Sequence, residues 1–308
     1  MERKSIFNLL GNKSVFIFLA IFFISSILLL RSLDNIGFAD RADEGYYLYY
    51  AKYVSDNGLA KFPDLFKFYL QDQRNWVFPN PLRIGFIFIS ALFVKLFGYS
   101  FVSLVKLSLI SFYIFLFISF CFIRKYFNEK LALLTLMLLA FSPLNMAMAR
   151  RALMDSTANL FTILAIWLFF ENTKERKAHK KILFILAYVC AILIKENSVL
   201  LSFFFMLYIL LKRGMYKTPA KLTDLLAVTV FPFSIVGTLY LLASGDIIKV
   251  IDTAKIIMSS PGYNQYAILF GSGPWYRYLI DFMLLSPWVC ILAIGFSLHY
   301  ITKREYRE

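Results

Sequence analysis

The run "VFIFLAIFFISSILLL" (15–30), followed closely by "FADRADEGYYLYYAKY" (38–53), decides the fold of this chain. The first run contains no charged residue, and its length suits a helix that crosses a bilayer. Because no small-residue cleavage site follows it, we interpret it as a retained span rather than a signal peptide. Directly after that span, and before a tyrosine-rich helix, the chain places four charged residues: Asp40, Arg41, Asp43 and Glu44.

The rest of the composition indicates a polytopic membrane protein. The chain has 308 residues, is 60% hydrophobic and has a mean hydropathy of +0.66, well above the apolar content of soluble domains. We expect an all-α protein of about eight transmembrane helices, forming one transmembrane domain over residues 1–308 without a soluble domain. The formal charge of +14 does not require nucleic acid, because the basic residues lie between apolar runs, where topology and anionic lipid explain them.

Five basic stretches set the expected topology, since cytoplasmic loops are rich in Lys and Arg. They are the N-terminus, "RKYFNEK" (124–130), "KERKAHKK" (174–181), "KRGMYKTPAK" (212–221) and "TKREYRE" (302–308). With all five inside, the predicted spans are 15–31, 101–123, 131–150, 155–171, 181–195, 198–211, 222–243 and 277–300. Both chain ends then face the cytoplasm.

The apolar segment 81–98 does not fit that count, because one more crossing would turn the later basic loops outward. We therefore interpret it as a juxtamembrane or re-entrant helix on the outer side, with Arg83 and Lys95 reaching the headgroups. The alternative is a true span with a weak topology signal. The outer face then holds the segments 32–100, 149–156, 195–197 and 244–276.

Asp43 and Glu44 open a predicted helix that ends at Gly58. Carboxylates are favoured at a helix N-terminus by the exposed N–H groups, so the pair has an ordinary structural explanation. Three tyrosines at helical spacing, Tyr46, Tyr50 and Tyr53, predict an aromatic stripe at the membrane interface. We expect this helix to lie flat on the outer leaflet.

Other charged residues lie near the outer ends of the predicted spans. Arg151 and Asp155 are four residues apart and could pair on one helix face. Lys195 interrupts a long apolar stretch, and Lys106 lies a few residues into a span. Each lysine could reach the headgroups, but charges in such places are costly unless paired, solvated or used in function.

Acids and cations on one side of the bilayer suit a reaction in which a carboxylate deprotonates an acceptor hydroxyl and cations neutralise a leaving phosphate. Other enzyme chemistries find little support. The only two histidines, His179 and His299, both fall on the expected inner side, and no glycine-rich phosphate loop is present.

Five motifs, in order, resemble those of the GT-C membrane glycosyltransferases, specifically the dolichyl-phosphate-mannose protein mannosyltransferase superfamily, which also holds the bacterial lipid A aminoarabinose transferases. They are "DEGYYLYYAKY" (43–53), "FPNPLRIGFIFISALFVKLFGYS" (78–100), "SPLNMAMARRALMDSTANLF" (142–161), "AILIKENSVLL" (191–201) and "GSGPWYRYLIDFMLLSPW" (271–288). Each motif is weak alone, and the five together make the resemblance.

The resemblance implies sugar transfer from a polyprenyl-phosphate donor to a protein, lipid or glycan acceptor, on the extracytoplasmic face of a prokaryotic plasma membrane. Asp43 would be the catalytic carboxylate, with Glu44 beside it and Asp155 as the second acid. Five cations are expected to bind the donor phosphate: Lys195, Lys106, Arg83, Arg150 and Arg151. A divalent metal ion, if the site uses one, would lie between Asp43 and Asp155.

The chain departs from the family pattern at two positions. Asn80 stands where the family usually has His or Lys, a loss that Arg83 or Arg74 could replace. Glu196 stands where the family has Gly after the lysine, and family members are usually longer. The alternatives are a lipid-glycan transporter, although its expected broken-helix repeats are not found, and an inactive partner subunit of a glycosyltransferase.

Overall fold

The structure, a computed structural model, describes residues 12–31, 42–216, 222–259, 273–274, 276–285 and 287–302. These residues form helices, and no strand occurs among them. The N-terminal elements are α1 Asn12–Leu30, α2 Ala42–Asn57, η3 Leu59–Lys61, α3 Phe62–Gln71, η4 Gln73–Val77, α4 Ile84–Phe97, α5 Phe101–Tyr126, α6 Glu129–Ala140 and α7 Pro143–Ala149. They continue with α8 Asp155–Glu175, α9 Ala178–Ile194, η5 Glu196–Leu200, α10 Leu201–Tyr216, α11 Leu222–Val228, α12 Val230–Ser244, α13 Ile247–Ser259, α14 Arg277–Leu285 and α15 Pro287–Thr302.

Two helical stretches in the described residues are long and apolar enough to cross a membrane, Phe101–Tyr126 and Leu222–Ser244. Helices α6 and α7 taken together would form a third membrane-spanning stretch, although the chain bends between them by 62°. Shorter apolar helices are Ser14–Leu30 and Ile84–Phe97. An integral membrane protein accounts for these helices, but the expected count of eight crossings is not confirmed.

Several expected spans are not single straight helices. The segment 131–150 is broken after Ala140, because Pro143 begins a new helix and disfavours helical backbone in the residue before it. The segment 277–300 is divided between α14 and α15, and Pro287 begins the second. The segment 198–211 starts as the tighter turn η5 and becomes α-helical at Leu201.

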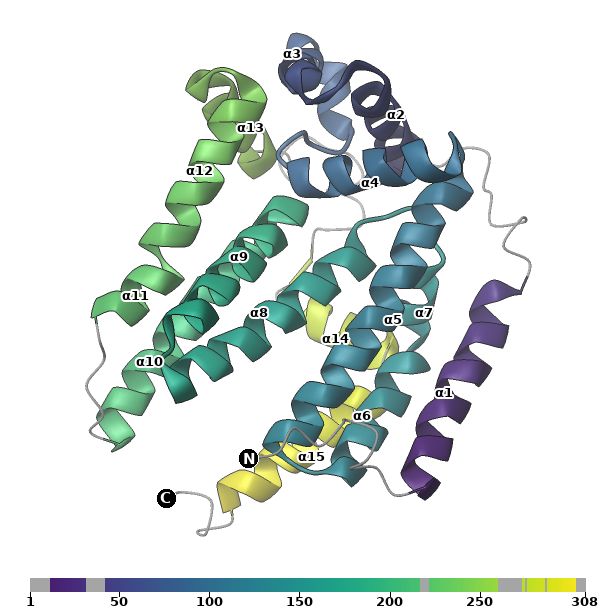
Figure 1. The fold of residues 1–308 in the computed structure, drawn as a ribbon, viewed down its shortest axis with the longest axis vertical. Coiled ribbons are helices and arrows are strands. Elements are labelled where there is room, and N and C mark those ends of the chain that lie inside the picture. Colours follow the sequence, from purple (N-terminus) through teal and green to yellow (C-terminus); the bar gives the residue numbers. More distant parts are fainter. Residues whose placement is uncertain are drawn as a thin grey trace.

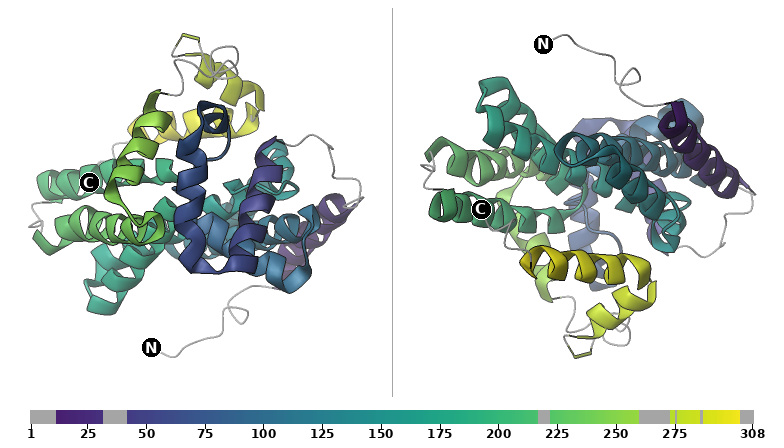
Figure 2. Two further views of the ribbon diagram at one scale, coloured as in Figure 1. Left: turned by 90° about the horizontal axis from the view of Figure 1, so that it is seen from above. Right: turned by 90° about the horizontal axis from the view of Figure 1, so that it is seen from below.

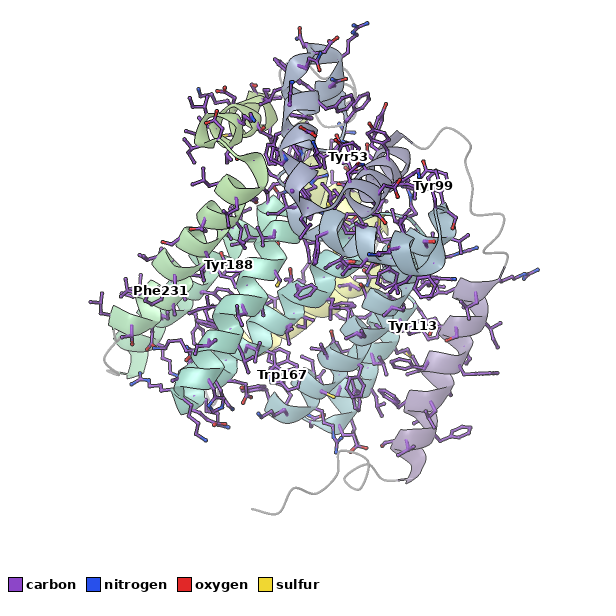
Figure 3. All side chains as sticks on the ribbon, turned by 45° about the horizontal axis from the view of Figure 1, so that its top comes forward. Tyr53, Tyr99, Tyr113, Trp167, Tyr188 and Phe231 are labelled. Atoms are coloured by element: carbon purple, nitrogen blue, oxygen red, sulfur yellow. The ribbon has the colours of Figure 1, made fainter. Side chains whose placement is uncertain are left out.

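The surface of the helices is strongly apolar, as expected of helices that face lipid. Large side chains on α1, α10 and α12 are exposed, among them Phe16, Phe23, Phe203, Phe204 and Leu242. Soluble monomers rarely expose apolar surface on this scale. Figure 3 shows aromatic residues distributed along the molecule, from Tyr53 and Tyr99 at one end to Trp167 of α8 and Phe231 of α12.

The elements divide between one end of the molecule and a bundle below it (Figure 1). The helices α2, α3, α4 and α13 gather at the upper end, and α5, α8, α9 and α12 run down from it. Seen from above, α2 and α3 lie over the ends of the bundle helices (Figure 2). The described parts of two segments that we expect on the outer face, 32–100 and 244–276, therefore gather at this end.

The helix α4 runs across the top of the bundle rather than along it (Figure 1). It has 14 residues and a length of about 21 Å, less than the roughly 30 Å of a bilayer core. Gly85 permits the close crossing of α4 over α9, because a Cβ there would lie only 3.0 Å from backbone and Cβ atoms of Leu193. This geometry is in keeping with a juxtamembrane helix, although the sidedness of 81–98 remains a prediction.

The opposite end of the bundle is held by a buried acid. Glu171 of α8 accepts hydrogen bonds from Tyr126 at 2.8 Å, from Lys180 at 2.6 Å and from Lys125. These contacts tie the ends of α5, α8 and α9 together beside the two basic stretches 124–130 and 174–181. The basic stretches and the α2 to α4 layer thus lie at opposite ends of the molecule.

Candidate functional site

The helix that carries Asp43 and Glu44 has the predicted extent. It covers Ala42–Asn57, with both acids in its first turn. Gly58 follows with a φ of 78°, and its N–H donates to the Val54 carbonyl at 2.9 Å. A positive φ at the residue that follows the last turn is favoured by glycine, so the predicted helix end is confirmed.

The three tyrosines of the expected stripe, Tyr46, Tyr50 and Tyr53, pack against protein rather than forming an outward-facing stripe, whereas Tyr49 of the same helix is exposed. Tyr50 is fully buried and donates to the Pro79 carbonyl at 3.2 Å. The ring of Tyr46 stacks on Phe78 with centroids 3.6 Å apart, and the Tyr53 hydroxyl bonds Asp64 at 2.8 Å. The helix is thus fixed on α3 and α4, and its expected position flat on the outer leaflet stays a prediction.

Glu44 joins α2 to the connection between α7 and α8. Its side chain is completely buried, and one carboxylate oxygen accepts from Arg151 Nε at 2.9 Å and from the Ala152 N–H at 3.2 Å. The expected alternative, an Arg151 to Asp155 pair on one helix face, is therefore wrong. Residues 151–154 are not helical and Asp155 is the first residue of α8, so the four-residue spacing does not align the two side chains.

Asp155 pairs instead with Lys195, whose Nζ lies 2.9 Å from Asp155 Oδ1. Because α8 and α9 run antiparallel, the first residue of α8 meets the residue that follows α9. Lys195 has extended backbone angles there, and both side chains are about one-third exposed, at 32% and 27%. The two residues lie at the end of the molecule that carries Asp43.

Arg83, just before α4, is held by Glu196. Its Nη2 and Nε donate to the two carboxylate oxygens at 2.9 and 3.0 Å, and its Nη1 donates to the Tyr47 hydroxyl at 2.5 Å. Asn80 Nδ2 donates to the same carboxylate at 3.0 Å. Burial opposes both charges, but the pairing outweighs it, raising the pKa of Arg83 and lowering the pKa of Glu196.

Asp43 stands open at the surface among these pairs. The protein packed around it raises the pKa of its carboxyl, Arg83 and Arg151 act in the opposite direction, and Glu44 and Asp155 raise it further. The raised pKa is the net result. The charges of both arginines and of the second acid thus act on one solvent-accessible carboxylate.

Two of the expected phosphate-binding cations have other contacts. Lys106 lies over the Phe97 ring, with its ammonium 4.5 Å from the ring centroid. Arg150 donates from Nη2 to the Arg31 carbonyl at 2.8 Å, which ties the end of α1 to the bundle. Arg74 pairs at the surface with Asp72, so Arg83 is the arginine that reaches the position near Asn80.

The described residues offer little for a metal ion. Within them, no group of three or more His, Cys, Asp or Glu side chains is arranged to hold one. The Lys195 ammonium already pairs with the Asp155 carboxylate. A metal ion at Asp155 would therefore have to displace this ammonium or bind beside its positive charge.

A family model described as dolichyl-phosphate-mannose-protein mannosyltransferase matches residues 81–238, more than half of the chain. The chain belongs to this family. Membership makes it a membrane glycosyltransferase of the GT-C type in general terms, and the family implies a polyprenyl-phosphate sugar donor and a macromolecular acceptor. No curated protein matches the sequence.

The matched range contains Arg83, Arg151, Asp155 and Lys195 but begins after α2. Asp43 is therefore linked to the family segment by its surroundings in the structure. Sequence reasoning assigned no role to Tyr47 and noted Glu196 only as a departure from the family pattern. The position of Tyr47 four residues after Asp43, on the same helix face, was the available signal.

Proposed function

We propose that the protein transfers a hexosyl or pentosyl group from a polyprenyl-phosphate sugar to a hydroxyl of a protein, lipid or glycan acceptor, on the extracytoplasmic face of a prokaryotic plasma membrane. One observation carries the proposal. In a member of this glycosyltransferase family, the open carboxylate of Asp43 is within electrostatic reach of Asp155, Arg83 and Arg151. Lys195 adjoins this group through Asp155.

Asp43 suits the role of general base. Its carboxylate is exposed, so an acceptor hydroxyl can approach it. Its raised pKa makes it a stronger base than an ordinary aspartate. Glu44 lacks this access, because its side chain is fully buried and one oxygen bonds Arg151 and Ala152. We assign Glu44 to holding α2 against the α7 to α8 connection.

The donor phosphate would bind Lys195 by replacing Asp155 as its partner. Lys195, Arg83 and Arg151 each pair with a carboxylate, so an incoming phosphate must displace an acid. The Lys195 to Asp155 pair is the simplest to open, since it has one hydrogen bond and both partners are about one-third exposed, at 32% and 27%. A lysine that bonds the leaving phosphate oxygens stabilises the charge that develops on them.

The proposed reaction is a single displacement. Asp43 accepts the proton of the acceptor hydroxyl while the hydroxyl oxygen forms a bond to the anomeric carbon. The bond from that carbon to the phosphate oxygen breaks, and the polyprenyl phosphate leaves toward Lys195 with the electron pair. Attack from the face opposite the phosphate inverts the anomeric configuration.

A donor panel tests this proposal. The purified protein in lipid nanodiscs is incubated with short-chain polyprenyl phosphates carrying different hexoses and pentoses, and with hydroxyl-bearing peptide, lipid and glycan acceptors. We expect transfer from at least one donor, with an anomeric configuration in the product opposite to that of the donor. Transfer from nucleotide sugars alone, or movement of labelled donor across vesicles without transfer, would contradict the proposal.

A further inference from the structure

Arg83 already makes more hydrogen bonds within the protein than we expect of a cation that is available to bind phosphate. Three of its five N–H donors are engaged, two with Glu196 and one with the Tyr47 hydroxyl. The same Glu196 carboxylate also accepts from Asn80, whose own side-chain oxygen accepts from the Leu82 N–H at 3.1 Å. The result is a continuous chain of hydrogen bonds from Glu196 through Arg83 to Tyr47.

The two ends of this chain lie beside the two groups that the proposed reaction uses. Tyr47 is four residues after Asp43 on α2, one turn along the same helix face. Glu196 directly follows Lys195 at the end of α9. A rigid connection between Tyr47 and Glu196 therefore fixes the separation between the helix bearing Asp43 and the turn bearing Lys195.

The Arg83 to Glu196 pair also differs from the Lys195 to Asp155 pair in strength. Arg83 uses two N–H groups on two carboxylate oxygens, and the side chains are 18% and 21% exposed, against 32% and 27% in the lysine pair. Two parallel charge-assisted hydrogen bonds hold a guanidinium in one orientation. Of the two pairs, the arginine pair is the one built to persist while a phosphate exchanges at the other.

We propose that Glu196, Arg83 and Tyr47 form a strut, defined by these three residues, that positions the Asp43 helix against the Lys195 turn. Glu196 and Tyr47 are positioning residues, and Arg83 acts through them rather than as a phosphate ligand. What the strut positions rests on the proposed function, but its mechanical role is a property of the fold alone.

Distances between spin labels test the mechanical role without any substrate. Spin labels are attached to two introduced cysteines, Asp56→Cys at the exposed end of α2 and Asn197→Cys in the exposed turn after α9. The native cysteines Cys121, Cys190 and Cys290 are replaced first. Tyr47→Phe and Glu196→Gln each remove one link of the strut while conserving side-chain volume. We expect the distance distribution between the labels to broaden or shift in both variants.

The matched control is Tyr50→Phe. It removes another buried tyrosine hydroxyl from the same helix, one that bonds the Pro79 carbonyl and not Arg83. The distribution should stay as narrow as in the parent protein. An unchanged distribution in both strut variants, or an equal broadening in the Tyr50→Phe control, would overturn the proposal, whether or not the protein transfers sugar.

Kinetics with the active donor from the panel separate a strut from a phosphate ligand. If the strut positions the base, Tyr47→Phe and Glu196→Gln lower kcat by about ten- to a hundredfold through misplacement of the base, with the donor KM unchanged. If Arg83 binds phosphate, Glu196→Gln frees the guanidinium and the donor KM falls, which would overturn the proposal. Broadened distances without transfer from any donor would refute the proposed function and leave the strut standing.

Discussion

Lys195 holds Asp155 by a single hydrogen bond of 2.9 Å, from a position about one-third exposed at 32%. Lys195→Ala should raise the donor KM roughly ten- to a hundredfold, because a hydrogen bond to a charged group contributes ~1.5–3 kcal/mol. Donor binding to the purified protein measures this directly. Lys52→Ala, which removes an exposed lysine of α2, is the control and should leave donor affinity unchanged. Equal loss in both variants would contradict the assignment.

The charge on Asp43 gives the reaction a predictable pH dependence. Its pKa is raised above the ordinary value of 3.8, chiefly because the surrounding protein removes part of its hydration, so the carboxylate form is lost on acidification at a higher pH than for an ordinary aspartate. A general base must be ionised, so kcat/KM should fall with decreasing pH through this raised pKa. The acid limb of the pH profile of kcat/KM is the measurement. An acid limb that persists unchanged in Asp43→Asn would assign the titration to another group.

At the scale of elements, the crossing of α4 over α9 depends on Gly85. A Cβ at this position would lie 3.0 Å from the carbonyl carbon and Cβ of Leu193, and a backbone neighbour cannot rotate away. Gly85→Ala should lower the free energy of unfolding by about 1–3 kcal/mol through overpacking.

Gly237→Ala is the matched control for Gly85→Ala. It adds the same methyl group in helix α12, where nothing lies within 4 Å, and should be neutral or stabilising. Thermal unfolding in detergent compares the two variants with the parent. A Gly85→Ala protein as stable as the Gly237→Ala protein would show that α4 is not closely packed on α9.

The elements differ in how far the sequence could predict them. The extent of α2 follows from local signals, since two acids begin it and Gly58 ends it. The choice of ion-pair partner depends instead on the local backbone. Arg151 pairs with Glu44 because residues 151–154 are not helical, and the i, i+4 spacing rule assumes a helix. The strut joins three segments distant in the sequence, and residue spacing has no information on that contact.

The expected spans show the same limit in the bundle. Hydropathy locates the apolar segments, but it does not show that Pro143 and Pro287 begin new helices inside two of them. The bend of 62° between α6 and α7 is the consequence in one case. Reading these prolines as helix starts would have predicted the breaks, although not their angle.

For the whole molecule, the site and the two described basic stretches, 124–130 and 174–181, lie at opposite ends of the bundle. Single cysteines at Asn197 and Lys130, in a background lacking the native cysteines, report the sidedness of each end. We expect an impermeant thiol reagent to label position 197 in intact cells and position 130 only after permeabilisation, because basic loops stay in the cytoplasm. The reverse pattern would refute the extracytoplasmic site.

The central claim is that Asp43 is the base of a membrane glycosyl transfer, and Asp43→Asn tests it most directly. The substitution keeps the size and the helix-start preference of the residue but removes its basicity. Because the protein packed around Asp43 removes part of its hydration and raises its pKa, its charge opposes folding above that pKa, so the Asn protein should fold at least as well at neutral pH. Below about pH 3.8, where the carboxyl is protonated in both the folded and the unfolded protein, this difference should vanish.

Turnover of Asp43→Asn with the active polyprenyl-phosphate sugar is the deciding measurement. We predict a fall of kcat by about a hundredfold or more, the range typical of general-base catalysis, with the affinity for the donor retained. Asp56→Asn, which changes an exposed aspartate at the far end of the same helix, should leave kcat unchanged. An Asp43→Asn protein that turns over as fast as the parent would contradict the account and leave Asp43 as a helix-terminal acid.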